Sequence, residues 1–352
     1  MGPECHEGSG SKRSLVGAVR WDGWYAGNEW ASNLSPEQWR DRLPFYARKM
    51  SEGVYEVRGD SQEIIDQEIA YASQAGLSYW AYCYSLPDAP GPDVHSYGIG
   101  FHLASKRKTD MGIAFILMAQ GFSGPKEEYA RAAEAFAAYF RDPAYQKVLN
   151  GRPLVYIFYV EAMPGYFGSD EAVRAGLDLI RSKAVEAGLQ PPYIVADVWN
   201  ASTGADCVDK FGFDAVSAYA WLDFSHGDQG YPYRDLARAC RDYWEACKAT
   251  GKKVVPIVSA GWDHRPRWRD PKRFEELYQT PPRGPWYEQP TPQELAANLQ
   301  AAVEWNKANS GAAEANTIII YAWNESDEGG WLVPTISEGT ARLDAVRKVL
   351  GR

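Results

Sequence analysis

The sequence has 352 residues, of which 45% are hydrophobic, enough for one large α/β domain or for two average ones. Its formal net charge of -9 at pH 7 argues against a general nucleic-acid surface and against an anionic membrane surface. The five histidines form no HxH or HExxH pattern and the five cysteines form no CxxC pair, so we expect no metal site, no cofactor and no disulfide framework.

The chain begins with MGPECHEGSGSKRS, which lacks the apolar core of a signal peptide. We expect residues 1–13 to be a disordered lead and residues 14–352 to form one domain. Because no run of eighteen apolar residues occurs, we expect a soluble protein without a membrane span. The compartment stays open between the cytoplasm and, if a signal has been removed, the periplasm or the exterior. The oligomeric state is equally open.

Apolar runs rich in β-branched and aromatic residues predict eight strands, and helical spacing of apolar residues predicts the helices between them. In chain order the expected strands are 15–21, 77–84, 111–118, 153–159, 193–199, 215–221, 253–259 and 317–323. The expected helices are 62–74, 126–139, 171–187, a short one near Cys207, 233–250, 292–308 and 338–350. Ser61 is the expected N-cap of the first helix and Gly76 its end. We expect loops at 87–93 and in the aromatic segment through Trp30, Trp39 and Tyr46.

Eight strands that alternate with helices predict an α/β fold, a single (β/α)8 TIM barrel. The alternative is an open, doubly wound sheet that binds a dinucleotide. That fold places a glycine-rich turn after its first strand, and the sequence has neither this turn nor a P-loop. We therefore favour the barrel.

Two glutamates follow the eighth predicted strand, in the stretch TIIIYAWNESDEGGWLVPT at 317–335. On an extended strand Glu325 and Glu328 would point to opposite faces, because side chains alternate. They can share a site only if the strand ends near Asn324 and the backbone curls into a turn, which Gly329 and Gly330 permit. The flanking Trp323 and Trp331 could supply an apolar wall that raises the pKa of one carboxyl. The alternative is a solvated acidic loop that closes the barrel.

In a barrel the carboxyl ends of all eight strands meet on one face, where catalytic residues lie. The predicted ends carry aromatic rings, acids and amides, and with 14 Trp and 22 Tyr in the chain they describe an aromatic-walled carbohydrate site. The alternative is an aromatic-rich core. The candidate substrate-binding residues are Trp21, Asp22, Tyr25, Tyr82, Tyr84, Tyr159, Asp197, Trp199, Tyr219, Trp262, His264, Arg265, Trp323, Asn324 and Trp331, and Gln120, Glu161, Trp221 and Asp263 also follow strands.

The loop 261–269 after the seventh predicted strand, GWDHRPRWR, concentrates three arginines and a histidine in an acidic protein. One interpretation is recognition of a carboxylate or sulfate on the substrate, because arginine binds such groups with two parallel hydrogen bonds. The alternative is that these arginines pair with local acids such as Asp263 and Asp270.

The run AWNESDEG at 322–329, followed by Pro334, resembles the WNExxEG signature of the family 99 glycoside hydrolases, the endo-α-1,2-mannosidases, and of their WbsX-like relatives. The early sequences GVY at 53–55 and AGLSYW at 75–80 are similar to that group in a looser way. The order of eight strands covers nearly the whole chain, and the C-terminal motif is the specific part of the resemblance.

The resemblance implies a (β/α)8 barrel in which the two glutamates of the motif hydrolyse a glycosidic bond with retention. In that group the sugar's own 2-hydroxyl attacks the anomeric carbon and gives a 1,2-anhydro sugar. Carried onto this sequence, Glu325 would assist loss of the 2-hydroxyl proton, and Glu328 would be the general acid and then the base for water. Asn324 would hold a carboxylate or a sugar hydroxyl.

The motif departs from its relatives at Ser326, where tryptophan is frequent, and Asp327 adds a third carboxylate. These departures leave mannose specificity open, and an acidic glycan is an alternative substrate. Two other functions are also open. One is a glycosyltransferase, although no DxD-type nucleotide site stands out, and the other is a glycan-binding barrel without catalysis.

Overall fold

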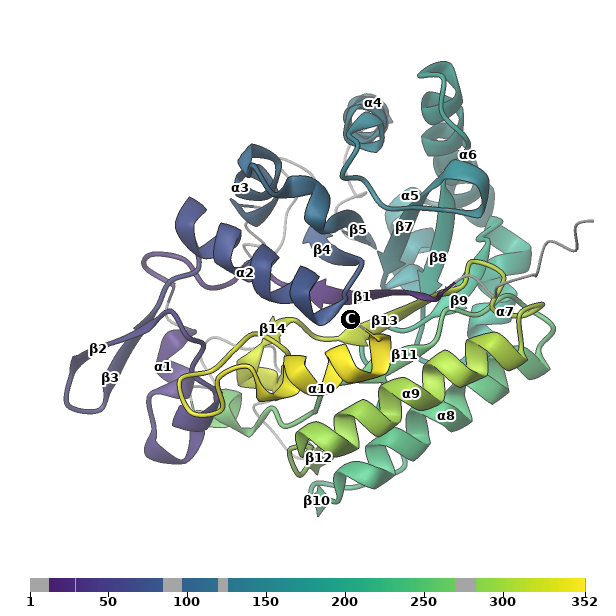
Figure 1. Cartoon of the computed structure of the whole chain (residues 1–352). Coiled ribbons are helices and arrows are strands. Elements are labelled where there is room, and N and C mark those ends of the chain that lie inside the picture. The colour runs from purple at the N-terminus through teal and green to yellow at the C-terminus, as the bar shows by residue number, and fades with distance from the viewer. Residues whose placement is uncertain (1–12, 29, 85–96, 120–125, 270–282, 352) are drawn as a thin grey trace, which may run out of the picture.

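The computed structural model describes residues 13–28, 30–84, 97–119, 126–269 and 283–351. Eight parallel strands form the barrel predicted from the sequence (Figure 1). In sheet order they are β11 (Ile257–Ser259), β13 (Thr317–Tyr321), β1 (Leu15–Arg20), β4 (Tyr79–Tyr84), β5 (Gly112–Met118), β7 (Arg152–Phe158), β8 (Tyr193–Asp197) and β9 (Ala215–Ser217). A parallel bridge between Val216 and Val254 links β9 to the segment before β11 and closes the ring.

All eight expected strands are present, and the prediction of a single TIM barrel is confirmed. Several strands are shorter than expected. The seventh was expected at 253–259, but β11 begins at Ile257, directly after Pro256. Proline has no backbone N–H for the ladder, so Val254 makes only an isolated bridge before it.

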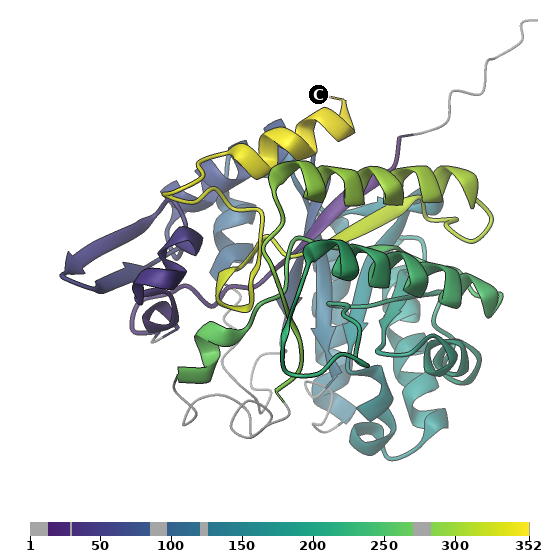
Figure 2. The same cartoon turned by 90° about the horizontal axis from the view of Figure 1, so that it is seen from below.

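Helices cover the outside of the barrel, and all seven expected helices are present (Figures 1 and 2). The longer helices are α2 (Gln62–Ala75), α3 (Tyr97–Ala104), α4 (Lys126–Arg141), α6 (Asp170–Glu186), α7 (Ala201–Phe211), α8 (Tyr233–Ala249), α9 (Pro292–Ala308) and α10 (Ala341–Leu350). As expected, the Ser61 side chain accepts a hydrogen bond from Ile64 N and caps α2, and Gly76 ends it with a φ of 90°.

The prediction of a loop between the first strand and α2 is wrong in part. This segment contains α1 (Ala31–Leu34), the 3-10 helix η1 (Glu37–Arg42) and a hairpin of β2 (Ala47–Ser51) and β3 (Val54–Val57), which projects from the barrel in Figure 2. The sequence ARKMS of β2 is mostly exposed, so no apolar run marks it as a strand. Helix α3 was also not expected. The expected loop at 87–93 and Gln120 lie outside the described residues, as does nearly all of the expected lead at 1–13.

Tyrosines on the strands occupy much of the barrel interior, where Tyr79, Tyr156, Tyr193 and Tyr321 are fully buried. The Tyr79 hydroxyl lies 2.7 Å from that of Tyr156 and 2.9 Å from the Thr317 hydroxyl, so these buried polar ends have partners. Part of the aromatic excess therefore belongs to the core, as the alternative interpretation expected.

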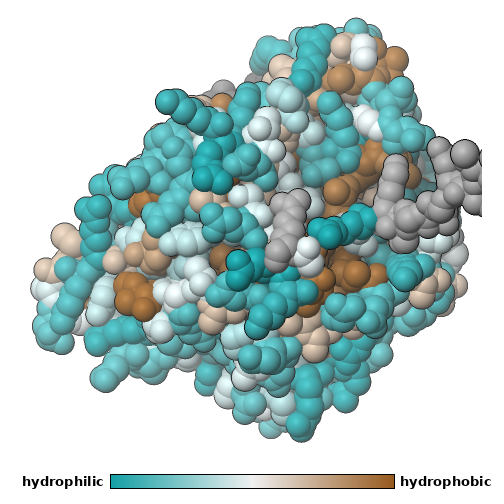
Figure 3. All heavy atoms as spheres, viewed as in Figure 1, coloured by the Kyte–Doolittle hydropathy of each residue, from teal (hydrophilic) through white to brown (hydrophobic). Residues whose placement is uncertain are grey.

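The face of the molecule drawn in Figure 3 is mostly hydrophilic, with apolar patches separated by polar residues. Among the helices that the structure describes, none has the length and apolar character needed to cross a membrane.

Candidate active site

The stretch after β13 makes the turn that the two glutamates require. Strand β14 (Asn324–Glu325) pairs antiparallel with β15 (Gly330–Trp331), and the 3-10 helix η8 (Ser326–Glu328) connects them. Gly329 has a φ of 87°, which lets the chain reverse directly after Glu328. The expected end of the strand and the turn after it are therefore present, and Glu325 and Glu328 both reach the same side chain, Arg267.

Arg267 lies on η6 (Arg265–Arg269) and is the cation of the site. Its Nη1 donates a hydrogen bond to Glu328, its Nε lies 2.8 Å from Oδ2 of Asp327, and its Nη2 lies 3.8 Å from Oε2 of Glu325. The four side chains are buried, and the guanidinium also lies 4.8 Å from the ring of Trp30. One buried guanidinium thus faces three carboxylates, which leaves an excess of negative charge if all three are ionised.

Glu325 and Glu328 have different hydrogen-bond partners. The Tyr219 hydroxyl donates to Glu325, whereas Glu328 accepts from both the Tyr321 hydroxyl and Arg267. Burial, and then the charge of Glu328, raise the pKa of Glu325 well above its usual value, and Arg267 opposes this rise only in part. Because Glu328 has a cation and a hydroxyl as donors, we infer that it is the ionised member of the pair and that Glu325 carries the proton.

Asn324 fastens two strand ends together. Its Oδ1 accepts from Trp21 N at 2.9 Å, its Nδ2 donates to Trp21 O at 2.6 Å, and its own carbonyl accepts from Trp24 Nε1. The side chain is fully buried. The structure therefore places Asn324 as a tie between β1 and β14, where its amide aligns the glutamates rather than facing a ligand.

Three predicted aromatic residues lie around the carboxylates. Tyr219 bonds Glu325, Trp262 lies 5.6 Å from the ring of Tyr321, and Trp21 lies 5.8 Å from the Arg267 guanidinium. Together with Trp30, these three rings surround the pair. Tyr25, four residues after Trp21, is partly exposed.

The two tryptophans expected to flank the pair point elsewhere. The Trp323 Nε1 donates to Glu68 of α2 at 2.9 Å, and the Trp331 ring packs against Arg342 of α10 at 3.8 Å. Both rings are buried. They anchor the turn to the helices around it. They do not form the apolar wall that was expected beside the pair, so other residues bury Glu325.

Another predicted group lies in a separate buried network at the ends of β1 and β4. Asp22 pairs with Arg20 at 3.0 Å and accepts from Gly98 N, and burial raises its pKa to about 6. The Tyr82 hydroxyl lies 3.0 Å from Nδ1 of His102, and Tyr84 stacks on Phe115. Asp22 and Tyr82 are fully enclosed, so the structure does not bring them to the glutamates.

Asp197 is also enclosed, at the end of β8. Its Oδ1 has no hydrogen-bond partner among the described residues, and burial raises its pKa well above the usual value. The charge of Glu161 adds to this rise. The structure therefore encloses Asp197 in the barrel instead of exposing it to a ligand.

The arginine loop is paired with acids. Arg265 binds Asp263 through two contacts of 2.7 and 2.9 Å and lies 3.4 Å from the Trp286 ring of β12 (Trp286–Tyr287), and Arg42 binds the same Asp263. The alternative interpretation, pairing with local acids, is thus confirmed for Arg265, while Asp270 lies outside the described residues. His264 is buried and its Nε2 lies 2.9 Å from Arg283 O, and burial lowers its pKa to about 4.

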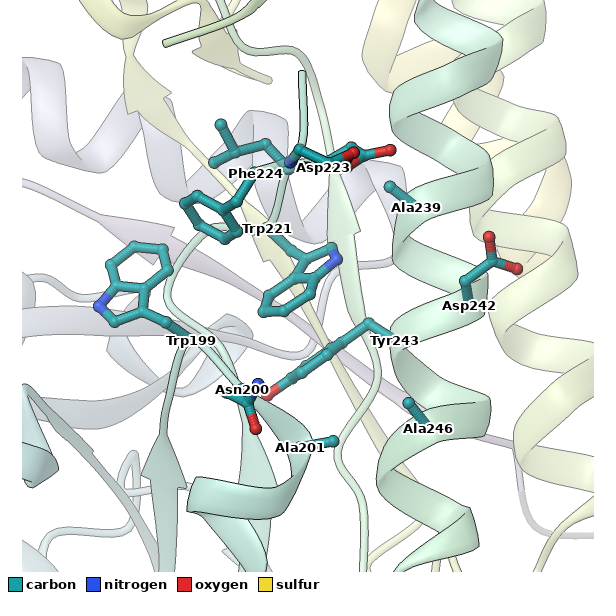
Figure 4. A pocket seen from close by; sticks show the side chains of 12 residues that line it. Trp199, Asn200, Ala201, Trp221, Asp223, Phe224, Ala239, Asp242, Tyr243 and Ala246 are labelled. Carbon is teal, nitrogen blue, oxygen red and sulfur yellow. Dashed lines mark hydrogen bonds between the residues drawn. The ribbon is translucent and has the colours of Figure 1, made fainter. Parts of the chain in front are cut away.

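A pocket of about 480 Å³ opens beside the carboxyl ends of β8 and β9 (Figure 4). Two predicted strand-end residues, Trp199 and Trp221, line it together with Phe224 and Tyr243. Tyr159 has a φ of 61° and is 39% exposed. Its ring contacts that of Phe158, which in turn contacts Trp199 of the pocket lining.

Sequence reasoning did not single out Arg267 and Tyr321 as site residues. Tyr321 lies within the apolar run that predicted the strand, so it looked like a core residue. Arg267 was one of three loop arginines, and nothing in the local pattern distinguished it from Arg265. The usable signal for Tyr321 was its place at the carboxyl end of a barrel strand.

A family model described as Glycosyltransferase WbsX matches residues 106–346, which is more than half of the chain. No curated protein matches the sequence.

Solved structures of low sequence identity share the fold. The chain is similar to a family 99 endo-α-mannosidase from Bacteroides thetaiotaomicron in complex with Bis-Tris-propane, with a TM-score of 0.58 and 13% identity over 96% of this chain and 95% of that chain. A second structure of a family 99 endo-α-mannosidase from that organism has a TM-score of 0.54 and 13% identity over 96% and 98%. An exo-β-1,4-mannosidase from Opitutaceae bacterium strain TAV5 has a TM-score of 0.50 and 11% identity over 96% and 59%. At these identities the likeness shows a common barrel fold.

Proposed function

The chain belongs to the WbsX family, and from this premise we propose that it is a glycoside hydrolase that cleaves an α-linked glycan with Glu325 and Glu328. The observation that carries the proposal is the pair itself. Two buried carboxylates in one turn face one guanidinium and differ in their hydrogen-bond donors, so they can hold a single proton between them. Hydrolysis of a glycoside needs such a combination of one acid and one base.

In the proposed reaction the carboxylate of Glu325 takes the proton of the sugar 2-hydroxyl as that oxygen bonds to the anomeric carbon. The glycosidic bond breaks, and its leaving oxygen takes a proton from Glu328. Water then opens the 1,2-anhydro sugar at the anomeric carbon, with Glu328 accepting the water proton and Glu325 returning its proton to the 2-oxygen. Two inversions give retention, and both carboxyls regain their starting state.

The proton distribution in the free protein differs from the one that the reaction needs. The contacts of the two glutamates favour the proton on Glu325, whereas the reaction starts with the proton on Glu328. We therefore propose that the proton moves from Glu325 to Glu328 when the substrate binds, as the sugar 2-hydroxyl becomes a donor to Glu325 and the leaving oxygen becomes an acceptor for Glu328.

The proposed substrate is neutral. Arg265 and Arg267 are both occupied by acids of the protein, so they do not offer a carboxylate or sulfate a ready partner. The negative charge of the carboxylate cluster would also oppose an anionic sugar ring. This argument favours a mannoside-like glycan over an acidic one.

The first experiment screens the wild-type protein against neutral and acidic α-linked oligosaccharides and measures released reducing ends. The substrate found is then given to Glu325→Gln and Glu328→Gln, with Glu304→Gln on exposed α9 as the matched control. We expect each site variant to lose about 10²–10⁴-fold in kcat and the control to lose none.

A dinitrophenyl α-glycoside of the same sugar separates the two roles, because its leaving group needs no proton. We expect Glu328→Gln to retain the first step, which releases dinitrophenol, and Glu325→Gln to lose it. The reverse pattern would exchange the acid and base roles, and full activity of either variant on the oligosaccharide would remove that residue from the proposal.

The description of the family as a glycosyltransferase favours a second candidate, transfer from a sugar nucleotide. The two candidates differ in the donor they consume. Reducing ends released in the absence of any sugar nucleotide support hydrolysis, whereas product formation that needs a sugar nucleotide supports the transferase.

A further inference from the structure

The pocket at the ends of β8 and β9 is walled by aromatic rings held at fixed angles. Trp221 stacks on Tyr243 with centroids 3.7 Å apart and an interplanar angle of 21°. The Phe224 ring stands nearly perpendicular to both Trp199 and Trp221, with centroids 5.5 Å from each. Figure 4 shows Trp199, Trp221 and Phe224 on one side of the pocket and α8 on the other, with the Tyr243 ring reaching from α8 toward Trp221.

The inner ring of this aromatic group, Tyr243, is held in place by hydrogen bonds, and the outer ring, Phe224, is exposed. The Tyr243 hydroxyl donates to Ser217 O at 2.8 Å and to Val198 O, which fixes the ring under Trp221. Phe224, in contrast, is 53% exposed. Small side chains opposite the rings, Ala239 and Ala246 on one face of α8, leave the space unfilled. Packing within the chain gives no reason to hold an exposed ring at the edge of an empty space of about 480 Å³.

We propose that this pocket is a second saccharide site, which holds a sugar unit of the same glycan chain at a distance from the bond that is cut. Flat aromatic faces suit the apolar faces of pyranose rings, and the polar rim supplies hydrogen-bond partners for the ring hydroxyls. The proposal rests on the proposed function for the identity of the glycan, and it makes the substrate a chain rather than a disaccharide.

The rim determines the class of sugar. Asp223 and Asp242 are carboxylates on the lining, and Asn200 adds an amide. Asp223 lies 3.4 Å from Nε2 of His226, and the nearby charge of Arg238 helps to lower its pKa, while Asp242 is exposed on α8. An acidic rim accepts the hydroxyls of a neutral sugar or the ammonium of an amino sugar and repels a uronate.

A line of aromatic contacts joins the pocket to the glutamates. Trp199 lies 5.8 Å from Phe158, Phe158 stacks on Tyr219 at 4.7 Å, and the Tyr219 hydroxyl donates to Glu325. The line runs from the carboxyl end of β8 past that of β9 to the turn after β13, all at the face where substrates bind in this fold. Because Phe158 is buried, a chain bound in the pocket would pass over this line along the open face to reach the reacting sugar.

The test either fills the pocket with a larger side chain or removes its exposed ring, and both changes are made at exposed positions outside the hydrophobic core. Ala246→Phe adds a ring to the pocket, and Ala249→Phe, also exposed on α8 and outside the lining, is its matched control. Phe224→Ala removes the exposed ring, and Tyr166→Ala, a 39% exposed ring on α5 (Met163–Phe167), is its control. Each is assayed for cleavage of α-mannan and α-glucan and of the matching disaccharide. Each is also made in the Glu328→Gln background for equilibrium binding to the same polymers.

We expect Ala246→Phe and Phe224→Ala to weaken binding of the preferred polymer and to raise its KM about five- to tenfold, with the disaccharide and both controls unchanged. Equal polymer binding and cleavage in all variants would overturn the second site while leaving the hydrolase standing. Polymer binding that depends on these positions, in a wild-type protein that cleaves nothing, would support the second site and overturn the hydrolase. A wild-type protein that binds none of the polymers would overturn the second site.

Discussion

At the scale of single residues, Arg267 sets the charge of the candidate site. Its guanidinium contacts Asp327, Glu328 and Glu325 together, and it is itself buried against Trp30. A buried ion pair adds little stability compared with an apolar pair, but removal of one partner leaves a buried charge without compensation. Arg267 is therefore needed to compensate the charge of the buried carboxylates, and we do not expect the ion pairs to add stability beyond that.

Replacement of Arg267 by glutamine should lower the free energy of unfolding by about 3–5 kcal/mol, because the buried Asp327 side chain loses its ion-pair partner. Addition of Asp327→Asn to this variant should recover part of the loss, since the uncompensated charge disappears. Urea denaturation measures both values.

Arg265→Gln is the control for this variant, because its partner Asp263 keeps a second ion pair with Arg42. We expect a loss of about 1 kcal/mol there. If Arg267→Gln costs no more than the control, Arg267 does not neutralise the cluster.

At the scale of elements, the site depends on the close contact of two loops. Asp263 N, in the loop after β11, donates to Glu328 O at 2.6 Å. A Cβ on Gly329 would lie 2.4 Å from that same nitrogen, and one on Gly261 would lie 2.2 Å from Gly329 O. Glycine at both positions lets the backbones touch, and this contact fixes the height of Glu328 above the barrel.

Gly329→Ala should therefore reduce both stability and catalysis. Gly339→Ala is a matched control, because Gly339 also has a positive φ, of 58°, but an added Cβ there meets no described atom within 4 Å. We expect the control to cost about 1–2 kcal/mol from its backbone conformation alone and to keep its activity.

The excess cost of Gly329→Ala over Gly339→Ala measures the loop contact, and we expect it to exceed about 1 kcal/mol with kcat reduced. Thermal unfolding and the oligosaccharide assay give the two readings. Identical behaviour of the two variants would show that the loops separate without consequence.

Elements marked by their own residues were predictable, and elements that depend on distant partners were not. The run at 317–321 and the glycines after Glu328 contain enough local information to place a strand and the turn that follows it. The hairpin of β2 and β3 has no such signal, because its strands are exposed and charged. Pro256 limits β11 to Ile257–Ser259, although Val254 and Val255 before the proline extend the apolar pattern.

The same distinction applies to the candidate site. Glu325 and Glu328 are three positions apart, so the sequence could bring them together in one turn. Arg267 and Asp327 are separated by 60 positions and Tyr219 and Glu325 by 106, and only the barrel makes them neighbours. A local pattern could not choose Arg267 over Arg265, because both follow the same acid in the same loop.

At the scale of the whole molecule, two buried histidines make stability depend on pH. Burial lowers the pKa of His102 and of His264 from 6.5 to about 4. Between these values the unfolded chain binds protons that the folded protein does not, so stability falls as the pH falls through this window. The raised pKa of Asp22, about 6, acts in the opposite direction over part of the same range.

His102→Gln should isolate one of these contributions. At about pH 5 the wild-type histidine costs about 2 kcal/mol relative to about pH 7, and the variant lacks this cost. The difference in unfolding free energy between the two proteins should therefore shrink as the pH is lowered from about 7 to about 5. A constant difference across this range would mean that His102 titrates normally in the folded state.

Strand β1 lies between β4 and β13 in the barrel, with Leu15 opposite Thr317. During synthesis the first strand leaves the ribosome some 300 residues before the partner that completes its hydrogen bonds. Until that partner arrives, β1 has an unpaired edge, which is the kind of surface on which nascent chains aggregate. The turn with both glutamates follows that last strand directly, so closure of the ring and assembly of the proposed catalytic pair are a single late event. A partly made chain would have part of the barrel wall but not the proposed catalytic pair.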